Sequence, residues 1–209
     1  MLPPMDEARK VRDFWFGKNP LAAEQLPRRM ELWFGGGSTD VQRHVDETLR
    51  ARFEPLVKQA FAGELAQWAD GPRRRLSLIL LLDQFPRNVY RDTAKAYAGD
   101  EQALSLALTG MQSVADAALN VVERIFFYMP LQHSESLEVQ EESVAAYKRL
   151  LGEAPEAIRS VFEGCVTFAE RHRDVIRQFG RFPHRNAVLG RPSTADEQTW
   201  LKNGGQSFA

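Results

Sequence analysis

The sequence predicts an all-α fold, and two observations lead to this prediction. Apolar residues recur at the three- and four-residue spacing of helices along most of the chain, and clear runs of alternating polar and apolar residues are missing. Glycine and proline interrupt this pattern at Gly35-Gly36-Gly37, Pro86, Pro130, Gly152 and Pro183. We therefore expect about eight helices, in a single domain that spans residues 1–209 with residues 202–209 as a frayed polar tail.

Four helices are expected in the first half of the chain, at Asp6–Phe16, Thr39–Ala62, Pro72–Phe85 and Asp100–Gln112. Ser38-Thr39 should cap the second of these, and Asp70-Gly71 should precede the third, where Pro72 suits the first turn. The third helix is apolar on almost every side over Leu76–Leu82, so it should lie at the centre of the fold. Pro86 should end it, because the residue before a proline is pushed out of the helical region.

Four more helices are expected in the second half, at Ala117–Tyr128, Glu135–Leu151, Pro155–Phe179 and Thr194–Leu201. Pro130 should stop the first of these, and Ser134 should cap the second. Thr194 stands just before two acidic residues, which favours a capped first turn in the last helix. The segment 180–193, broken at Pro183, is the longest irregular stretch, and we expect an ordered loop with a function.

The composition excludes several classes of function. The formal net charge is −1, so the chain lacks the positive field that captures nucleic acid. The N-terminal sequence has no apolar segment behind a basic head, and the longest apolar run is far shorter than a membrane span. We therefore expect a cytoplasmic protein with neither nucleic acid nor membrane as a partner. The single cysteine, Cys165, lies on an apolar helical stripe, which suits a buried and unreactive thiol.

Four predicted helices each carry one polar residue on an apolar face, namely Asp83, Glu123, Gln140 and His172. A buried carboxylate or imidazole needs a bonding partner. One interpretation is a polar cavity lined by these four residues, with a mouth formed by Arg87, His133, Glu135, His184 and Arg185. The other is that the polar groups bond to one another, or to arginines such as Arg124 and Arg181, and only hold the helices together.

Two similar strings follow apolar runs, QFPRN at Gln84–Asn88 and RFPHRN at Arg181–Asn186. Each places an arginine and an asparagine at a predicted break in the chain. Arg87 and Arg185 could together hold a carboxylate or a phosphate through paired hydrogen bonds. Alternatively, each arginine caps carbonyl groups at the end of the preceding helix. A shared anion site requires both arginines.

The segment Tyr128–Glu135, YMPLQHSE, supplies candidates for acid–base chemistry. His133 or His184 could act as a general base, oriented by Asp83 or Glu135. The histidines show no three- or four-residue spacing, and the metalloprotease string HExxH and the nucleophile string GxSxG do not occur. The sequence thus predicts no metal site and indicates no particular cofactor, although a metal held by distant residues such as His133, His172 and His184 stays open.

These strings together resemble those of a widespread, mainly bacterial family known only as a domain of unknown function. The resemblance extends from VRDFWFG at Val11 to TADEQTWL at Thr194 and rests on LDQFPRN at Leu82–Asn88, ERIFFYMPLQHSE at Glu123–Glu135, Gln140, GRFPHRN at Gly180–Asn186 and LGRPST at Leu189–Thr194. It implies an all-helical fold similar to the tetratricopeptide-like right-handed superhelix. It implies no activity, cofactor or catalytic residue, and a fold alone does not dictate a function.

The leading hypothesis is a helical binding module with a polar cleft for a small anionic ligand or an acidic peptide. The anion would be held by Arg87, Arg185 and Arg191. The residues expected to orient it or to line the same site are Asn88, Gln140, His172 and Asn186. The first alternative is a hydrolase-like enzyme whose catalytic candidates are His133, His184, Asp83 and Glu135. The second is a purely structural interaction protein. The sequence leaves the oligomeric state and the partner open.

Overall fold

The computed structural model describes residues 5–18, 25–34 and 39–205. Within these ranges the chain is all-α, as predicted, and contains no β-strand. The predicted break at Gly35-Gly36-Gly37, the cap at Ser38 and the end of the predicted tail lie outside the described residues. The α-helices are α1 (Met5–Phe16), α2 (Leu26–Phe34), α3 (Thr39–Phe61), α4 (Pro72–Ile79), α5 (Phe85–Val89), α6 (Asp100–Gln112), α7 (Val121–Gln132), α8 (Leu137–Glu153), α9 (Arg159–Phe179) and α10 (Ala195–Lys202).

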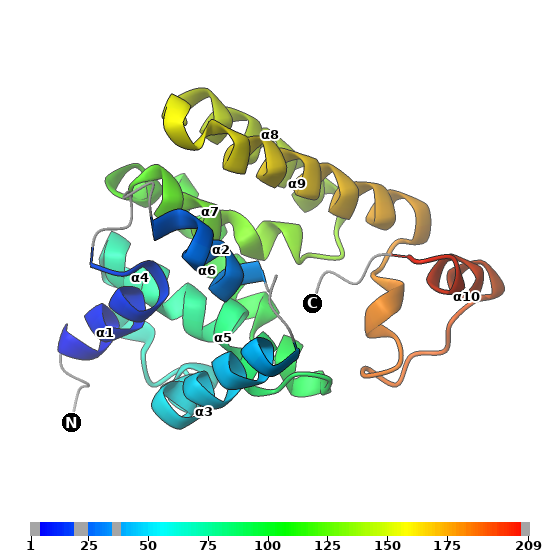
Figure 1. Ribbon diagram of the computed structural model, residues 1–209, viewed down its shortest axis with the longest axis horizontal. Coiled ribbons are helices and arrows are strands. Elements are labelled where there is room, and N and C mark those ends of the chain that lie inside the picture. Colours follow the sequence, from blue (N-terminus) through cyan, green and yellow to red (C-terminus); the bar gives the residue numbers. More distant parts are fainter. Residues whose placement is uncertain (1–4, 19–24, 35–38, 206–209) are drawn as a thin grey trace.

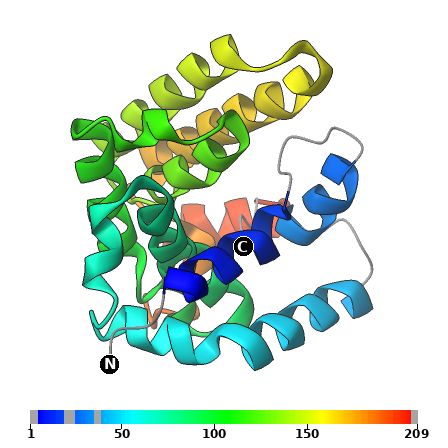
Figure 2. The ribbon, with the colours of Figure 1, turned by 90° about the vertical axis from the view of Figure 1, so that its left-hand side faces the viewer.

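The helices form two opposite edges with a packed interior between them. Helices α8 and α9 run side by side along one edge, with α7 next to them, and α3 forms the opposite edge (Figures 1 and 2). Helix α10 stands at one end of the molecule, where Trp200 packs against Phe179 of α9 with ring centroids 5.4 Å apart. Within the described ranges, no helix combines the length and the apolar character of a membrane span.

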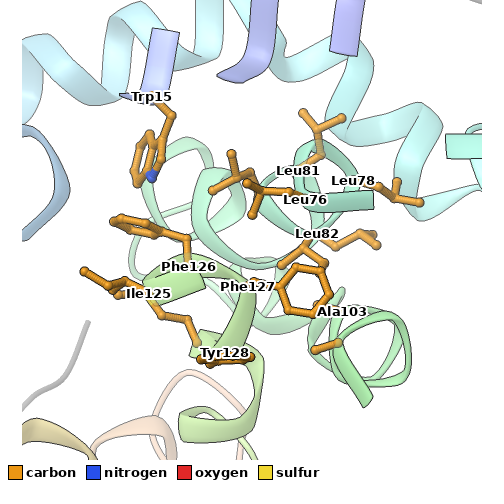
Figure 3. Close-up of a cluster of buried hydrophobic side chains, with 14 of the residues drawn as sticks. Trp15, Leu76, Leu78, Leu81, Leu82, Ala103, Ile125, Phe126, Phe127 and Tyr128 are labelled. Carbon is orange, nitrogen blue, oxygen red and sulfur yellow. The ribbon is translucent and has the colours of Figure 1, made fainter. Parts of the chain in front are cut away.

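The core is centred on α4, as its sequence predicts. Every residue from Leu76 to Leu82 is at most 4% exposed, because neighbouring helices cover all sides of this segment. Trp15 of α1 reaches the same core and meets Phe126 of α7 edge-on, with ring centroids 5.5 Å apart (Figure 3). A second, smaller apolar cluster lies near the C-terminus and contains Val175, Ile176 and Phe182.

The predicted break at Pro86 is wrong, because the helix continues through it. A π turn over Leu80–Gln84 follows α4 and leads directly into α5, so the chain stays helical from Pro72 to Val89. A proline ring clashes with the carbonyl group four residues earlier and offers it no N–H. The wider π turn relieves this crowding just before Pro86. The carbonyl group four residues before Pro86 is that of Leu82. Gly99 packs so closely against it that a Cβ at Gly99 would lie 2.3 Å from the Leu82 oxygen.

The predicted break at Pro130 is also wrong, since Pro130 lies inside α7. The Tyr147 hydroxyl donates a hydrogen bond to the Ile125 carbonyl at 2.7 Å, next to the Phe126 carbonyl that Pro130 cannot bond. Helix α7 therefore extends four residues beyond Tyr128, the expected end, to Gln132.

The starts of α7 and α8 also differ from the prediction. Asn120 and Glu123 form a capping box that begins α7 at Val121, and the residues before it form a 3₁₀ turn instead of the first helical turns. Ser136, and not Ser134, caps α8. Helix α2 was not predicted at all, although its Leu26–Phe34 segment buries Trp33 against Phe16 at 6.1 Å between ring centroids.

The C-terminal segment follows the predicted pattern of breaks. Gly180 ends α9 with a φ of 70°, a left-handed conformation suited to glycine. Phe182 is extended and Pro183 then begins a 3₁₀ turn, η7 (Pro183–Arg185), so the break at Pro183 is confirmed. Thr194 caps α10 in a capping box with Glu197, as predicted.

Candidate functional site

Asp83 and His133 form the most buried polar pair among the candidate residues. The π turn places Asp83 inside the fold, where it is fully buried, and His133 follows the last turn of α7. His133 Nδ1 lies 2.6 Å from Asp83 Oδ1. Because an ionised carboxylate only accepts hydrogen bonds, Nδ1 carries the proton and donates the hydrogen bond to Asp83. The Gln84 side chain donates to the other carboxylate oxygen of Asp83.

Arg87 connects Asp83 to Asp100, the first residue of α6. Its Nη1 donates to the Asp83 backbone carbonyl at 2.5 Å and lies 3.2 Å from the Asp83 carboxylate. Its Nη2 donates to Asp100 Oδ2 at 3.0 Å. The guanidinium is thus enclosed by two carboxylates, and its side chain is only 10% exposed.

Arg185, from η7, completes the group. Its Nη1 donates to Asp100 Oδ2 at 3.2 Å and to the His133 carbonyl at 3.1 Å. Its guanidinium packs on the rings of Tyr97 and Phe182, 4.7 Å and 4.4 Å from their centroids. Its Nε is buried and has no hydrogen-bond partner. We call Asp83, Arg87, Asp100, His133 and Arg185 the polar cluster.

The formal charges of the polar cluster cancel, because it contains two carboxylates, two guanidinium groups and a neutral imidazole. Burial would raise the pKa of Asp83, but Arg87 and the His133 hydrogen bond outweigh burial and hold that pKa well below its usual range. Burial lowers the pKa of His133, and the positive charge of Arg87 acts in the same direction. His133 is therefore neutral at neutral pH. Burial and Arg87 also lower the pKa of Arg185.

His172 and His184 flank the polar cluster on the side of Phe182. The ring of His172 lies 6.2 Å from that of His133 and 5.7 Å from that of Phe182, and the ring of His184 lies 5.6 Å from that of Phe182. His172 Nδ1 is 2.7 Å from the Phe168 carbonyl oxygen. Burial lowers the pKa of both His172 and His184 to about 3, so both are neutral at neutral pH.

A second polar network joins the loop 180–193 to the start of α8 and to α10. Glu135 accepts hydrogen bonds from Arg191 at 2.7 Å and 3.0 Å and from the Phe182 backbone N–H at 2.8 Å. Arg191 Nε donates to Asn186, whose amide in turn reaches Glu197 at 3.2 Å. Every nitrogen of the Arg191 guanidinium is therefore in use, and this network holds the loop in place.

The structure places three other candidate residues outside the polar cluster. Asn88 bonds to Gln42 of α3 at 3.3 Å and to Arg91 at 3.1 Å. Gln140 donates to the Gln132 and Ser134 carbonyls at 2.6 Å and 2.7 Å and so satisfies the free end of α7. Glu123 closes the capping box of α7 and lies 3.8 Å from Arg12.

The sequence did not suggest Asp100, a member of the polar cluster, or Tyr97, which packs against Arg185. Asp100 looks in the sequence like an ordinary acidic residue in the first turn of a helix, and Tyr97 lies in a short 3₁₀ turn just before it. Nothing in their local sequence indicates two arginines nearby. Only the long-range packing of α6 against the π turn and η7 brings them together.

Metal binding and cavities give little further guidance. In the parts of the chain that the structure describes, no three potential metal ligands of the His, Cys, Asp or Glu type converge. Cys165 is partly buried, and burial raises the pKa of its thiol to about 12. A groove of about 1020 Å³ lies between α9 and α10, lined among others by Phe179, Arg181 and Trp200, and does not include the polar cluster.

Comparisons with known proteins agree with the fold and assign no activity. Residues 11–205 match the model of a family described as bacterial proteins of unknown function, DUF924. The chain is similar to a solved structure of a protein of unknown function from Agrobacterium tumefaciens, ATU0120, with 32% sequence identity and a TM-score of 0.77. That similarity covers 95% of this chain and 98% of the other. A comparison with curated protein sequences gave no match.

Proposed function

The chain belongs to the DUF924 family of bacterial proteins of unknown function, and from the chemistry of its polar cluster we propose that it binds a small molecule carrying a carboxylate or a phosphate, at Arg185. The net charge of −1 favours such a ligand over nucleic acid. A free carboxylate on a metabolite and the C-terminal carboxylate of a peptide offer the same two oxygens, so the chemistry of the anion defines the ligand.

The observation that carries this proposal is the unused edge of the Arg185 guanidinium. Within the described part of the chain, both of its hydrogen bonds leave from Nη1, and its buried Nε has no partner. An arginine presents Nε and Nη2 as one side of a planar fork, and this side matches two oxygens of a carboxylate or phosphate. Leaving a buried charged donor unbonded is costly, so an anion on this edge would be stabilised.

The surroundings of Arg185 fix the orientation of its guanidinium. The rings of Tyr97 and Phe182 both pack against its guanidinium. Arg87 holds Asp100, and Asp100 holds Nη1 of Arg185, so the unused edge has a defined direction. A group that is already oriented loses less conformational freedom on binding, which increases the affinity for a given set of contacts.

The experiment compares two arginines that differ in their unused hydrogen-bonding capacity. Phosphate, citrate and a short acidic peptide with either a free or an amidated C-terminus are tested by thermal shift and calorimetry. Arg185→Lys keeps a charge for Asp100 but removes the fork, and we expect it to weaken binding about 10- to 100-fold. Arg191→Lys is the control, because Arg191 bonds through all of its guanidinium nitrogens. We expect it to lower the melting temperature without changing the affinity.

Each alternative outcome has a definite meaning. Equal loss of affinity in both variants, or no loss in Arg185→Lys, would contradict a site at Arg185. If none of the four probes binds and both variants only lower the melting temperature, the polar cluster has a structural role.

A further inference from the structure

The tautomer of His133 is fixed by its contact with Asp83. Nδ1 donates to the carboxylate at 2.6 Å, so the other ring nitrogen, Nε2, carries the lone pair. The carboxylate is itself held by Gln84 and lies 3.2 Å from Arg87 Nη1. These contacts keep it ionised and leave it unable to rotate freely. His133 is thus an imidazole with one nitrogen bound and the other available as a proton acceptor.

The available nitrogen is not used to hold the fold together. His133 has no hydrogen bond through Nε2 to any described residue, and Nε2 is not among the fully buried atoms that lack a partner. The ring edge that carries Nε2 therefore belongs to the 9% of the side chain that remains exposed. If His133 served only to connect α7 to the π turn, we would expect Nε2 to have a hydrogen-bond partner as well, because buried polar atoms are nearly always hydrogen-bonded.

His133 and the arginine of the proposed anion site are joined by a hydrogen bond. The His133 backbone carbonyl accepts a hydrogen bond from Arg185 Nη1 at 3.1 Å, and Asp83 and Asp100 are joined through Arg87. A molecule on the unused edge of Arg185 would therefore be held by a residue that is itself bonded to His133, whose imidazole Asp83 orients. An imidazole held by a carboxylate at Nδ1, with Nε2 free, is the arrangement of a general base.

We propose that His133 accepts a proton from the molecule that Arg185 holds, with Asp83 as its positioning residue. This inference rests on the anion site proposed above. The Nε2 lone pair forms a bond to the proton of an X–H group on the ligand, and X keeps the electron pair of the broken bond. The imidazolium that results is stabilised by the adjacent Asp83 carboxylate. The proton then returns to X or passes to water, so no further reactant is needed.

The first part of the test reads the tautomer and the accessibility of His133 directly. ¹⁵N spectra of histidine-labelled protein at pH 7 should show the Nδ1–H tautomer for His133. Diethyl pyrocarbonate, which acylates the unprotonated imidazole nitrogen, should modify His133, with the exposed His44 as the internal reference. An Nε2–H tautomer, or a His133 that is not acylated while His44 is, would overturn the proposal.

The second part links His133 to the anion site. Phosphate and citrate are added at about ten times the Kd measured for each, and they should slow the acylation of His133 about tenfold while leaving His44 unchanged. His133→Asn supplies an amide N–H to Asp83 and lacks Nε2. It should lose the acylated peptide, which assigns the protected signal to His133.

The outcomes separate the two proposals. A thermal shift with phosphate or citrate and no acylation of His133 would leave the anion site standing and overturn the proton acceptor. Acylation without any thermal shift or protection would mean that the anion site has failed, and the coupling of His133 to a ligand with it.

Discussion

Asp100 serves two arginines with one carboxylate. It bonds to Arg87 at 3.0 Å and to Arg185 at 3.2 Å, and neither arginine side chain is more than 10% exposed. Asp100→Asn would leave two buried guanidinium groups with a single carboxylate, that of Asp83. Removing one partner from a buried ion pair leaves an uncompensated charge, so we expect the free energy of unfolding to fall by about 3 kcal/mol in urea titrations.

An exposed ion pair provides the comparison for Asp100. Glu163 lies 3.6 Å from Arg159, and both side chains are more than 40% exposed. Glu163→Gln should change the free energy of unfolding by about 0.5 kcal/mol or less, because water and salt screen such pairs. Similar losses in the two variants would contradict the view that the polar cluster depends on charge balance.

At the residue scale, the sequence predicted which groups needed partners better than it predicted the partners. Asp83 falls on the buried side of an apolar helix, and this position alone shows that it must be paired. His133 and Arg87 were both among the candidates for the same site. Asp100 and Tyr97 were not, because their roles depend on contacts 85 residues apart in the chain, such as that between Arg185 and Asp100.

At the scale of the helix, Gly99 allows α6 to pack against the π turn. A Cβ at this position would lie 2.3 Å from the Leu82 oxygen and 2.9 Å from a ring atom of Phe61. Gly99→Ala should therefore lower the free energy of unfolding by about 1–3 kcal/mol, because a well-packed interior does not accept an extra methyl group.

Gly152→Ala is the matched control for Gly99→Ala. Gly152 lies in the last turn of α8, and a Cβ there would meet no atom within 4 Å. Alanine has a higher helix propensity than glycine, so the free energy of unfolding of this variant should rise by about 0.5–1 kcal/mol. Urea titrations of both variants give the comparison, and a loss at Gly152 or a gain at Gly99 would contradict it.

The prolines explain why helix ends were harder to predict than helices. Pro86 and Pro130 end helices according to local rules, because each lacks an N–H and crowds the preceding turn. In the folded chain the π turn makes room before Pro86, and α7 continues through Pro130 to Gln132. The local rule that a proline ends a helix shows neither outcome. By contrast, the cap at Thr194 is made by residues three apart and was predicted correctly.

For the whole molecule, buried histidines should make stability depend on pH. Burial lowers the pKa of His172 and His184 to about 3, from 6.5 in the unfolded chain. Between these values the unfolded state binds more protons than the folded state, so the free energy of unfolding falls as the pH falls below about 6.5. His172 alone should account for a loss of about 2 kcal/mol between pH 7 and pH 5.

The acid sensitivity is tested by urea titrations at several pH values. His172→Gln should flatten the change between pH 7 and pH 5 relative to the unaltered protein. The carboxylates act in the same direction at lower pH, because Arg87 and Arg181 hold the pKa values of Asp83 and Glu197 below their usual range. A free energy of unfolding that is constant between pH 7 and pH 5 would show that these histidines are not buried in neutral form.

The all-α class was the most secure prediction, because helical periodicity accumulates over the whole chain and does not depend on any single contact. Helix α2 was not predicted, because its segment is short and its apolar residues are buried only through a distant contact, that of Trp33 with Phe16. The tetratricopeptide-like superhelix stays a prediction, since it concerns how successive helix pairs are turned relative to one another.

The small apolar cluster of Val175, Ile176 and Phe182 is separate from the main core. Segments with few buried contacts can open while the rest of a protein stays folded. The segment after Gly180 is connected to the body through Arg185 and through the Glu135–Arg191 pair. A ligand on Arg185 would add to these attachments, and removing it would loosen them. The rate of hydrogen exchange in η7 and α10 would then fall when the ligand binds. The bound anion would thus hold the C-terminal segment against the rest of the fold.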